Sequence, residues 1–304
     1  MAETKDGVPT VYQKISNAWN TWPRTAKLCV AFTYAQIFTC ILAYCLYEVG
    51  PMHQGPKEDE LAVFSMARNA LIIPMALITL VAMYQVAEMC SPKPRHRALV
   101  ISRVCMWEFM LKMTYYTLLS RGYGLAFQNL RSSDYRPIYG TRYVGWTFAV
   151  PTMVFMNLYP LMDEHRVIDV LIRLFPQMAA SSTYCLACGL GCILFDASMG
   201  WALCFLGCFA YVAITADEVV YVQERISTTS QPVVKGIGIA IKTVLFVIYT
   251  VVYLLGNWGF VSSYSVQACY SCLDIFHMAT FSSLLFLYWN MDTPKLASKA
   301  DHND

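Results

Sequence analysis

The chain has 304 residues, of which 57% are apolar, and its mean hydropathy is +0.44. A soluble globular domain is about half apolar, so this composition excludes one and indicates an integral membrane protein surrounded by lipid. The formal net charge of +2 gives no indication of a nucleic-acid partner, and none is expected.

Apolar segments long enough to cross a bilayer, about 20 residues each, recur along the whole chain. The eight predicted spans are 27–48, 60–89, 98–120, 142–162, 167–194, 198–222, 234–258 and 265–290. Residues 1–26 form a polar tail that lacks the apolar core of a signal peptide, and residues 291–304 form a second polar tail. The fold class predicted is an all-α membrane protein, with no effector enzyme expected within these residues.

The basic residues of the predicted loops gather on one side of the membrane. That side receives the N-terminal tail, the loop that contains Lys93, Arg95 and Arg97, and the C-terminal tail. The opposite side has fewer basic residues, namely Lys57, Arg121, Arg131 and Arg136. Because cytoplasmic loops are enriched in Lys and Arg, we predict that both termini are cytoplasmic.

The loop 121–141, which reads RGYGLAFQNLRSSDYRPIYGT, is the longest predicted connection. Its Gly, Tyr and Arg content favours a small hairpin or an ordered loop.

Twelve cysteines lie mostly inside the predicted spans, so we expect no disulfide framework. Cys185, Cys188 and Cys192 follow one helix face. Tetrahedral zinc sites usually draw ligands from turns and separate elements. We therefore interpret these cysteines as small packing residues between helices and expect no metal site.

Ionisable side chains in the middle of a span are costly and are candidates for function. Glu108 and Lys112 lie four residues apart, in the favourable order for a pair on one helix face. They could hold helices together, form an ion or proton path, or provide a reactive amine. Asp274 needs a cation, for which Arg142 or Lys112 is the candidate, and His277 follows on nearly the same face. Lys242 is expected to extend toward the membrane surface.

Several motifs resemble those of the microbial rhodopsin family. The segment RYVGWTFAVP at 142–151 resembles the third core helix of that family, with Arg142, Tyr143 and Trp146 in register. LLSRGYGL at 118–125 resembles the end of the second core helix. FVIYTVVYLLG at 246–256 is similar to the sixth core helix, and Asp274 matches the aspartate of the retinal-binding helix.

The resemblance also carries departures that reinforce one another. Met278 stands where the family has the lysine that forms the Schiff base with retinal, and Gly145 stands where it has the primary counterion. Met156 takes the place of the proton donor of pumps. A buried cation needs an adjacent anion, so losing lysine and counterion together is physically consistent. Loss of the lysine alone would suggest an engineered exchange at 278.

The resemblance implies a seven-helix bundle over 60–290, with 27–48 as an extra transmembrane helix. This arrangement is similar to the eight-helix membrane domains of rhodopsins linked to cyclic-nucleotide enzymes. It further implies an altered retinal pocket, formed by Trp146, Tyr143, Phe246, Tyr249, Tyr253 and His277.

Three functions remain open at this point. The first is a rhodopsin-like sensor or regulatory scaffold that is not an enzyme, lacks covalent retinal and does not pump. It would act as a homo- or hetero-oligomer or through an effector subunit, and retinal or another apolar ligand could bind without a covalent bond. The second is a photoreceptor in which Lys112 binds retinal, with Glu108 or Asp274 as counterion. The third is a channel or transporter that uses the buried charges as a polar path.

Overall fold

The structure is a computed structural model that describes residues 24–50, 52, 56–89, 96–128, 137–159, 167–193, 198–226 and 232–291. Most of the two predicted tails lies outside these residues. The described part contains eight α-helices and two short strands. Their bounds are α2 Arg24–Glu48, α3 Glu58–Met89, α4 His96–Leu119, β1 Phe127–Gln128, β2 Pro137–Ile138, α5 Gly140–Leu158, α6 Val167–Ile193, α7 Ser198–Ile226, α8 Pro232–Asn257 and α9 Ser263–Met291.

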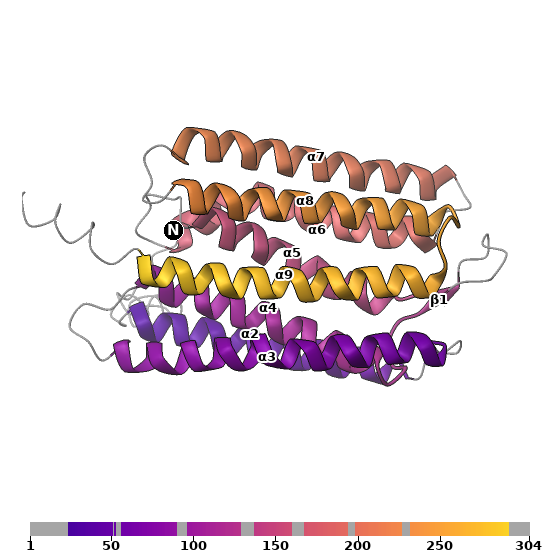
Figure 1. Cartoon of the computed structure of the whole chain (residues 1–304), viewed down its shortest axis with the longest axis horizontal. Helices are drawn as coiled ribbons and strands as arrows, with labels where there is room; N and C mark the ends of the chain where they lie inside the picture. Colours follow the sequence, from indigo (N-terminus) through magenta and orange to yellow (C-terminus); the bar gives the residue numbers. More distant parts are fainter. Residues whose placement is uncertain are drawn as a thin grey trace, which may run out of the picture.

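The helices lie side by side along the long axis of the molecule (Figure 1). From α3 to α9 each helix contacts the next one in the chain, and α9 returns to contact α3. Helix α4 also contacts α9, which brings these two helices together inside the bundle. Helix α2 packs against α4, where Trp107 Nε1 donates a hydrogen bond of 2.9 Å to Thr39 Oγ1.

The helices are rich in apolar residues and long, as expected for helices that cross a membrane. Among the described residues, four segments are long and apolar enough to cross a membrane, Val30–Glu48, Glu58–Val81, Ser198–Glu224 and Ile239–Asn257. Pro74, Pro151 and Pro176 lie inside helices, as membrane helices tolerate when neighbouring groups satisfy the backbone.

Polar and apolar side chains are distributed as in a protein surrounded by lipid. Large apolar side chains point outward, such as Phe205 and Phe209 of α7, which are 69% and 73% exposed. Charged side chains lie inside, including Lys112, Arg142 and Asp274. An isolated charge in an apolar interior is costly, so the interior of the bundle is the place to look for function.

The loop between α4 and α5 fixes the position of Arg142. Strand β1 pairs antiparallel with β2, as the hairpin alternative predicted for this loop requires; residues 129–136 lie outside the described residues. Gly124 has φ +108°, and a β-carbon there would lie 2.2 Å from Thr141 Oγ1. The Thr141 hydroxyl accepts a hydrogen bond from the backbone N–H of Leu125. This contact anchors the first turn of α5, next to Arg142.

Candidate functional site: a buried ion cluster around Asp274

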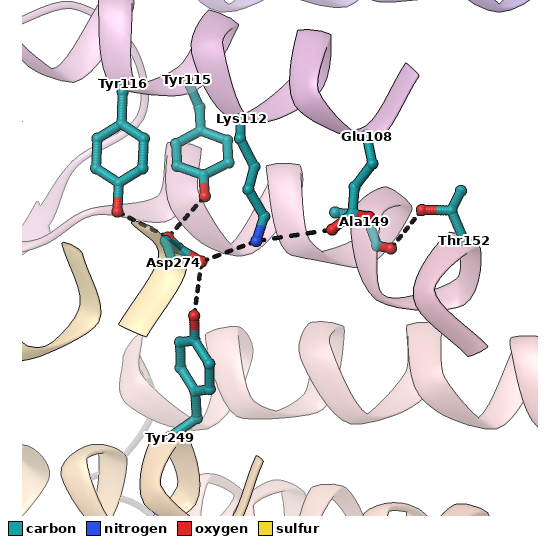
Figure 2. A network of polar contacts seen from close by, with 8 residues as sticks. All are labelled: Glu108, Lys112, Tyr115, Tyr116, Ala149, Thr152, Tyr249 and Asp274. Atoms are coloured by element: carbon teal, nitrogen blue, oxygen red, sulfur yellow. Dashed lines mark hydrogen bonds and ion pairs between the residues drawn. The ribbon is translucent and has the colours of Figure 1, made fainter. Parts of the chain in front are cut away.

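The carboxylate of Asp274 is the centre of a buried polar cluster (Figure 2). Its Oδ1 accepts hydrogen bonds from Lys112 Nζ at 3.1 Å and from the Tyr249 hydroxyl at 2.7 Å. Its Oδ2 accepts hydrogen bonds from the hydroxyls of Tyr115 at 2.8 Å and Tyr116 at 2.7 Å. Four donors thus surround one carboxylate, and the cation expected for Asp274 is Lys112.

Helical spacing brings three of these donors to one face. Lys112, Tyr115 and Tyr116 occupy positions i, i+3 and i+4 of α4, which share one side of a helix, and this side faces α9. Tyr249 reaches the same carboxylate from α8. Three helices therefore meet at one side chain, and Lys112 points into the bundle with only 1% of its surface exposed.

Lys112 also faces a second carboxylate. Its Nζ lies 3.7 Å from Glu108 Oε1, one turn earlier on α4, which confirms the predicted pair. Figure 2 shows Glu108 and Asp274 on opposite sides of the ammonium group. The contact with Glu108 is longer than a hydrogen bond, whereas the contact with Asp274 is a hydrogen-bonded ion pair.

Arg142 is buried without an ion-pair partner within 4 Å among the described residues. Its Nη1 donates a hydrogen bond to Gln267 Oε1. The guanidinium also lies over aromatic rings, at 5.3 Å from Tyr270, 5.7 Å from Tyr116 and 5.9 Å from Trp146. Cation–π contacts of this kind stabilise a desolvated cation. Arg142 therefore borders the Asp274 cluster without pairing with the carboxylate.

A small cavity lies next to Arg142. Its volume is about 40 Å³, and its wall includes Arg142, Gln267, Tyr143 and Asn257. A water molecule needs roughly 10–15 Å³ of such space and several polar partners, so the cavity has room for a few waters.

Gly145 makes room for Tyr115. A β-carbon on Gly145 would lie 2.5 Å from Cδ1 of the Tyr115 ring. Position 145, where the resemblance leads one to expect a carboxylate, thus leaves space for the phenol that donates to Asp274.

The expected pocket aromatics divide into two groups. Trp146 makes edge contacts with Tyr143, Tyr249 and Tyr270 at ring separations of 5.1–5.5 Å. Phe246 lies 6.1 Å from both Tyr249 and His277. These contacts bring Trp146, Tyr249, Phe246 and His277 near Asp274.

The hydroxyls of Tyr143 and Tyr253 instead contact α6. The Tyr143 hydroxyl lies 3.2 Å from Cys192 Sγ, and the Tyr253 hydroxyl donates to the carbonyl of Cys188 at 3.0 Å. These cysteines therefore take part in packing between helices.

Met278 follows Asp274 by four residues in α9, and its side chain lies outside the described part of the structure.

A second buried ion pair corrects the expectation for Lys242. This side chain was predicted to extend to the membrane surface, but it is 4% exposed and pairs with Glu218 of α7. The interior partner explains the difference, because a buried carboxylate removes the need for the ammonium to reach water. The pair borders a cavity of about 10 Å³ whose wall includes Tyr184, Tyr211 and Phe246.

Sequence reasoning did not identify several members of the polar interior. Tyr115 and Tyr116 could have been found from their spacing to Lys112, and Gln267 from its place two turns before Asp274. Glu60, at the start of α3, is also fully buried and accepts hydrogen bonds from the hydroxyls of Tyr139 and Ser263. Glu60 lies at the end of a predicted span, where a charged residue is normally exposed, so the sequence did not indicate that it is buried.

Helices α3 to α9 form a closed ring of contacts around a buried ion cluster. Together with the long apolar segments among the described helices, this arrangement defines an integral, multi-pass α-helical membrane protein. The sequence model of the family described as bacteriorhodopsin-like protein matches residues 65–291. The chain therefore belongs to this family. No curated protein matches the chain in sequence.

Solved structures of microbial rhodopsins share the fold. The transmembrane domain and linker of Salpingoeca rosetta rhodopsin phosphodiesterase has a TM-score of 0.67 at 12% identity, covering 89% of this chain and 86% of that one. The light-driven proton pump of Coccomyxa subellipsoidea has a TM-score of 0.63 at 15% identity, covering 76% and 97%. Halorhodopsin, a light-driven chloride pump, has a TM-score of 0.58 at 18% identity, covering 72% and 92%. Proteins with different activities share this fold, so the function must be argued from the site.

Proposed function

We propose that the chain is a membrane sensor or regulatory scaffold of the rhodopsin family that holds no covalent retinal and pumps no ions. The ion pair between Lys112 and Asp274, at 3.1 Å, carries this proposal. In the family resemblance, Asp274 faces a protonated Schiff base. Here the Lys112 ammonium supplies the positive charge, and Met278, at the position of the family lysine, has no amine that could bind an aldehyde.

The cavities support the same function. Pockets that bind a small molecule such as retinal usually have volumes of about 300–1,000 Å³. The cavities beside Arg142 and Lys242 measure about 40 and 10 Å³. In the part of the chain that the structure describes, the aromatic side chains pack against one another where the resemblance implies a retinal pocket.

The proposed architecture follows the order of helix contacts. Helices α3 to α9 form the seven-helix bundle over residues 60–290, and α2 is the extra transmembrane helix, corresponding to 27–48. Both termini face the cytoplasm. The chain itself performs no catalysis, and its output passes through a homo- or hetero-oligomer or an effector protein. The shared fold with the membrane domain of a rhodopsin phosphodiesterase supports this arrangement.

A second candidate is a photoreceptor with retinal attached to Lys112. The observation that favours it is the position of one buried amine between two carboxylates, at 3.1 Å from Asp274 and 3.7 Å from Glu108. The protonated Schiff base between retinal and Lys112 would be a buried cation and would need such an anion beside it. The amine would first have to give up its proton, for which the Asp274 carboxylate at 3.1 Å is the nearest acceptor.

An absorption spectrum separates the two functions. The full chain is expressed with all-trans retinal, purified, and measured before and after acid denaturation, which traps a Schiff base. The sensor without covalent retinal predicts no band beyond that of free retinal. A red-shifted, acid-trappable band would overturn it.

Two matched variants then locate any attached retinal. Lys112→Arg keeps a cation beside Asp274 but cannot form a Schiff base, so it should abolish a band that depends on Lys112. Lys242→Arg does the same at the other buried ion pair and should leave that band intact. A band that survives Lys112→Arg would contradict the second candidate.

A further inference from the structure

The carboxyl group of Glu108 differs from that of Asp274 in its surroundings. It is fully buried, and neither of its oxygens has a hydrogen-bond partner among the described residues. The Thr152 hydroxyl donates to the carbonyl of Ala149 (Figure 2). In the described part of the chain, the polar group closest to the Glu108 carboxyl is the Lys112 ammonium, at an ion-pair distance of 3.7 Å.

The charges around Glu108 do not balance if it is ionised. The ionisable groups that face it in the described structure are Cys105 and Lys112 from α4 itself and Asp274 from α9. Lys112 carries a single positive charge and lies closer to Asp274, at 3.1 Å. Asp274 also accepts three phenol hydrogen bonds, which favour its ionised form. Among the described residues, the cation beside Glu108 is therefore Lys112, which is already paired with Asp274.

We propose that Glu108 is a proton-binding site in the core of the bundle and carries a proton at neutral pH. A buried carboxylate without hydrogen bonds or its own counterion is strongly unfavourable, and protonation removes that charge. Lys112 and Asp274 then form a neutral pair beside a neutral acid. This inference goes beyond the proposed function and holds whether or not retinal binds.

Because Glu108 lies next to Lys112, loss of its proton affects the ion pair between Lys112 and Asp274. When Glu108 loses the proton, Lys112 lies between two anions and is attracted away from Asp274 toward Glu108. The ammonium thus has two alternative partners on opposite sides (Figure 2), and the proton on Glu108 decides between them. A switch of Lys112 between two partners can shift the positions of helices only if one of the two pairings stabilises a different helix arrangement. The Lys112–Asp274 pair joins α4 and α9, so these are the two helices on which the switch acts.

Infrared spectroscopy of the full chain in an alkyl maltoside detergent, which has no carbonyl group, and without retinal, tests the proposal. A protonated carboxylic acid has a carbonyl stretch that an ionised carboxylate lacks. We expect this band at neutral pH in the unmodified chain and its loss in Glu108→Gln. The variant Glu218→Gln removes a buried carboxyl that pairs with Lys242 and not with Lys112, and serves as the control that keeps the band. A band that persists in Glu108→Gln, or no band in the unmodified chain, would overturn the proposal.

Thermal unfolding gives an independent readout. Gln has the size of Glu and is neutral, so Glu108→Gln should keep the Tm of the unmodified chain at neutral pH. Glu108→Asp, which retains the acid, should also retain the infrared band. A Glu108→Gln chain that fails to fold or has a much lower Tm would count against a neutral Glu108.

Discussion

The ring of Tyr115 fills the space that a side chain at position 145 would need. A β-carbon on Gly145 would come within 2.5 Å of the ring, and the hydroxyl of that ring donates to Asp274 at 2.8 Å. The glycine and the tyrosine are therefore coupled: an aspartate at 145 and the present position of Tyr115 exclude each other. A phenol, rather than a second carboxylate, completes the surroundings of Asp274.

Gly145→Ala should destabilise the protein because the added methyl group overlaps Tyr115. Close to the ring base the tyrosine has little freedom to move, and overpacking of this kind typically costs about 1–3 kcal/mol. We expect a lower Tm by circular dichroism in detergent, and a larger loss for Gly145→Asp, which adds a buried charge.

The matched control for this prediction is Tyr115→Ala. With the ring removed, Gly145→Ala should cost less than in the unmodified chain, so the double variant should be more stable than the sum of the single effects predicts. Additive effects would show that the two positions are not coupled.

Asp274→Asn should be among the most destabilising conservative changes in the chain. The amide keeps the size of the carboxylate but leaves the ammonium of Lys112 without its nearest anion. Breaking a buried pair by removing one partner typically costs about 3–5 kcal/mol, so the Tm should fall strongly.

Replacing both partners separates charge from packing. Lys112→Met combined with Asp274→Leu removes both charges, and apolar replacement of a buried pair is often close to neutral. The double variant should recover part of the stability lost in Asp274→Asn. A double variant that is less stable than Asp274→Asn would show that the phenol hydrogen bonds to Asp274, and not its pairing with Lys112, dominate.

The sequence was sufficient for the parts of the site that depend on one helix. Composition predicts the helices, and the spacing of Glu108 and Lys112 predicts their contact, because positions i and i+4 of one helix are neighbours wherever the helix lies. The need of Asp274 for a cation follows from the cost of a buried charge. These inferences require no knowledge of how the helices pack.

Contacts between helices could not be predicted in the same way. Whether Lys112 or Arg142 pairs with Asp274 depends on the rotation of α4 and α5 about their axes, which a single sequence does not specify. The burial of Lys242 depends on Glu218, 24 residues earlier and on another helix. Without that partner the expectation of an ammonium extended to the membrane surface was reasonable, and it was wrong.

The Glu218–Lys242 pair should tolerate exchange better than loss. Lys242→Met leaves Glu218 as an unpaired buried carboxylate, and Glu218→Leu leaves Lys242 as an unpaired ammonium, so each should lower the Tm. The exchange Glu218→Lys with Lys242→Glu retains both charges between α7 and α8 and should restore part of the loss. If the exchanged chain were no more stable than the single variants, the pair would not stabilise this contact.

Tyr139 should contribute to loss of stability at alkaline pH. It lies in the loop before α5, and burial together with its hydrogen bond to Glu60 raises its pKa. An unfolded tyrosine releases its proton near pH 10, at about its ordinary pKa, whereas the folded chain keeps the Tyr139 proton to higher pH. The stabilisation is therefore present below about pH 10 and is lost as pH rises above it.

Tyr139→Phe should weaken this pH dependence, because the variant has no phenol proton at this position to release on unfolding. The measurement is the Tm between neutral pH and about pH 11, above the ordinary tyrosine pKa, by circular dichroism in detergent. Tyr34→Phe, at a side chain that is 68% exposed, is the control and should follow the unmodified chain. The same alkaline decrease in Tyr139→Phe as in the control would contradict the assignment, since the buried phenol would then hold its proton no more tightly than an unfolded one.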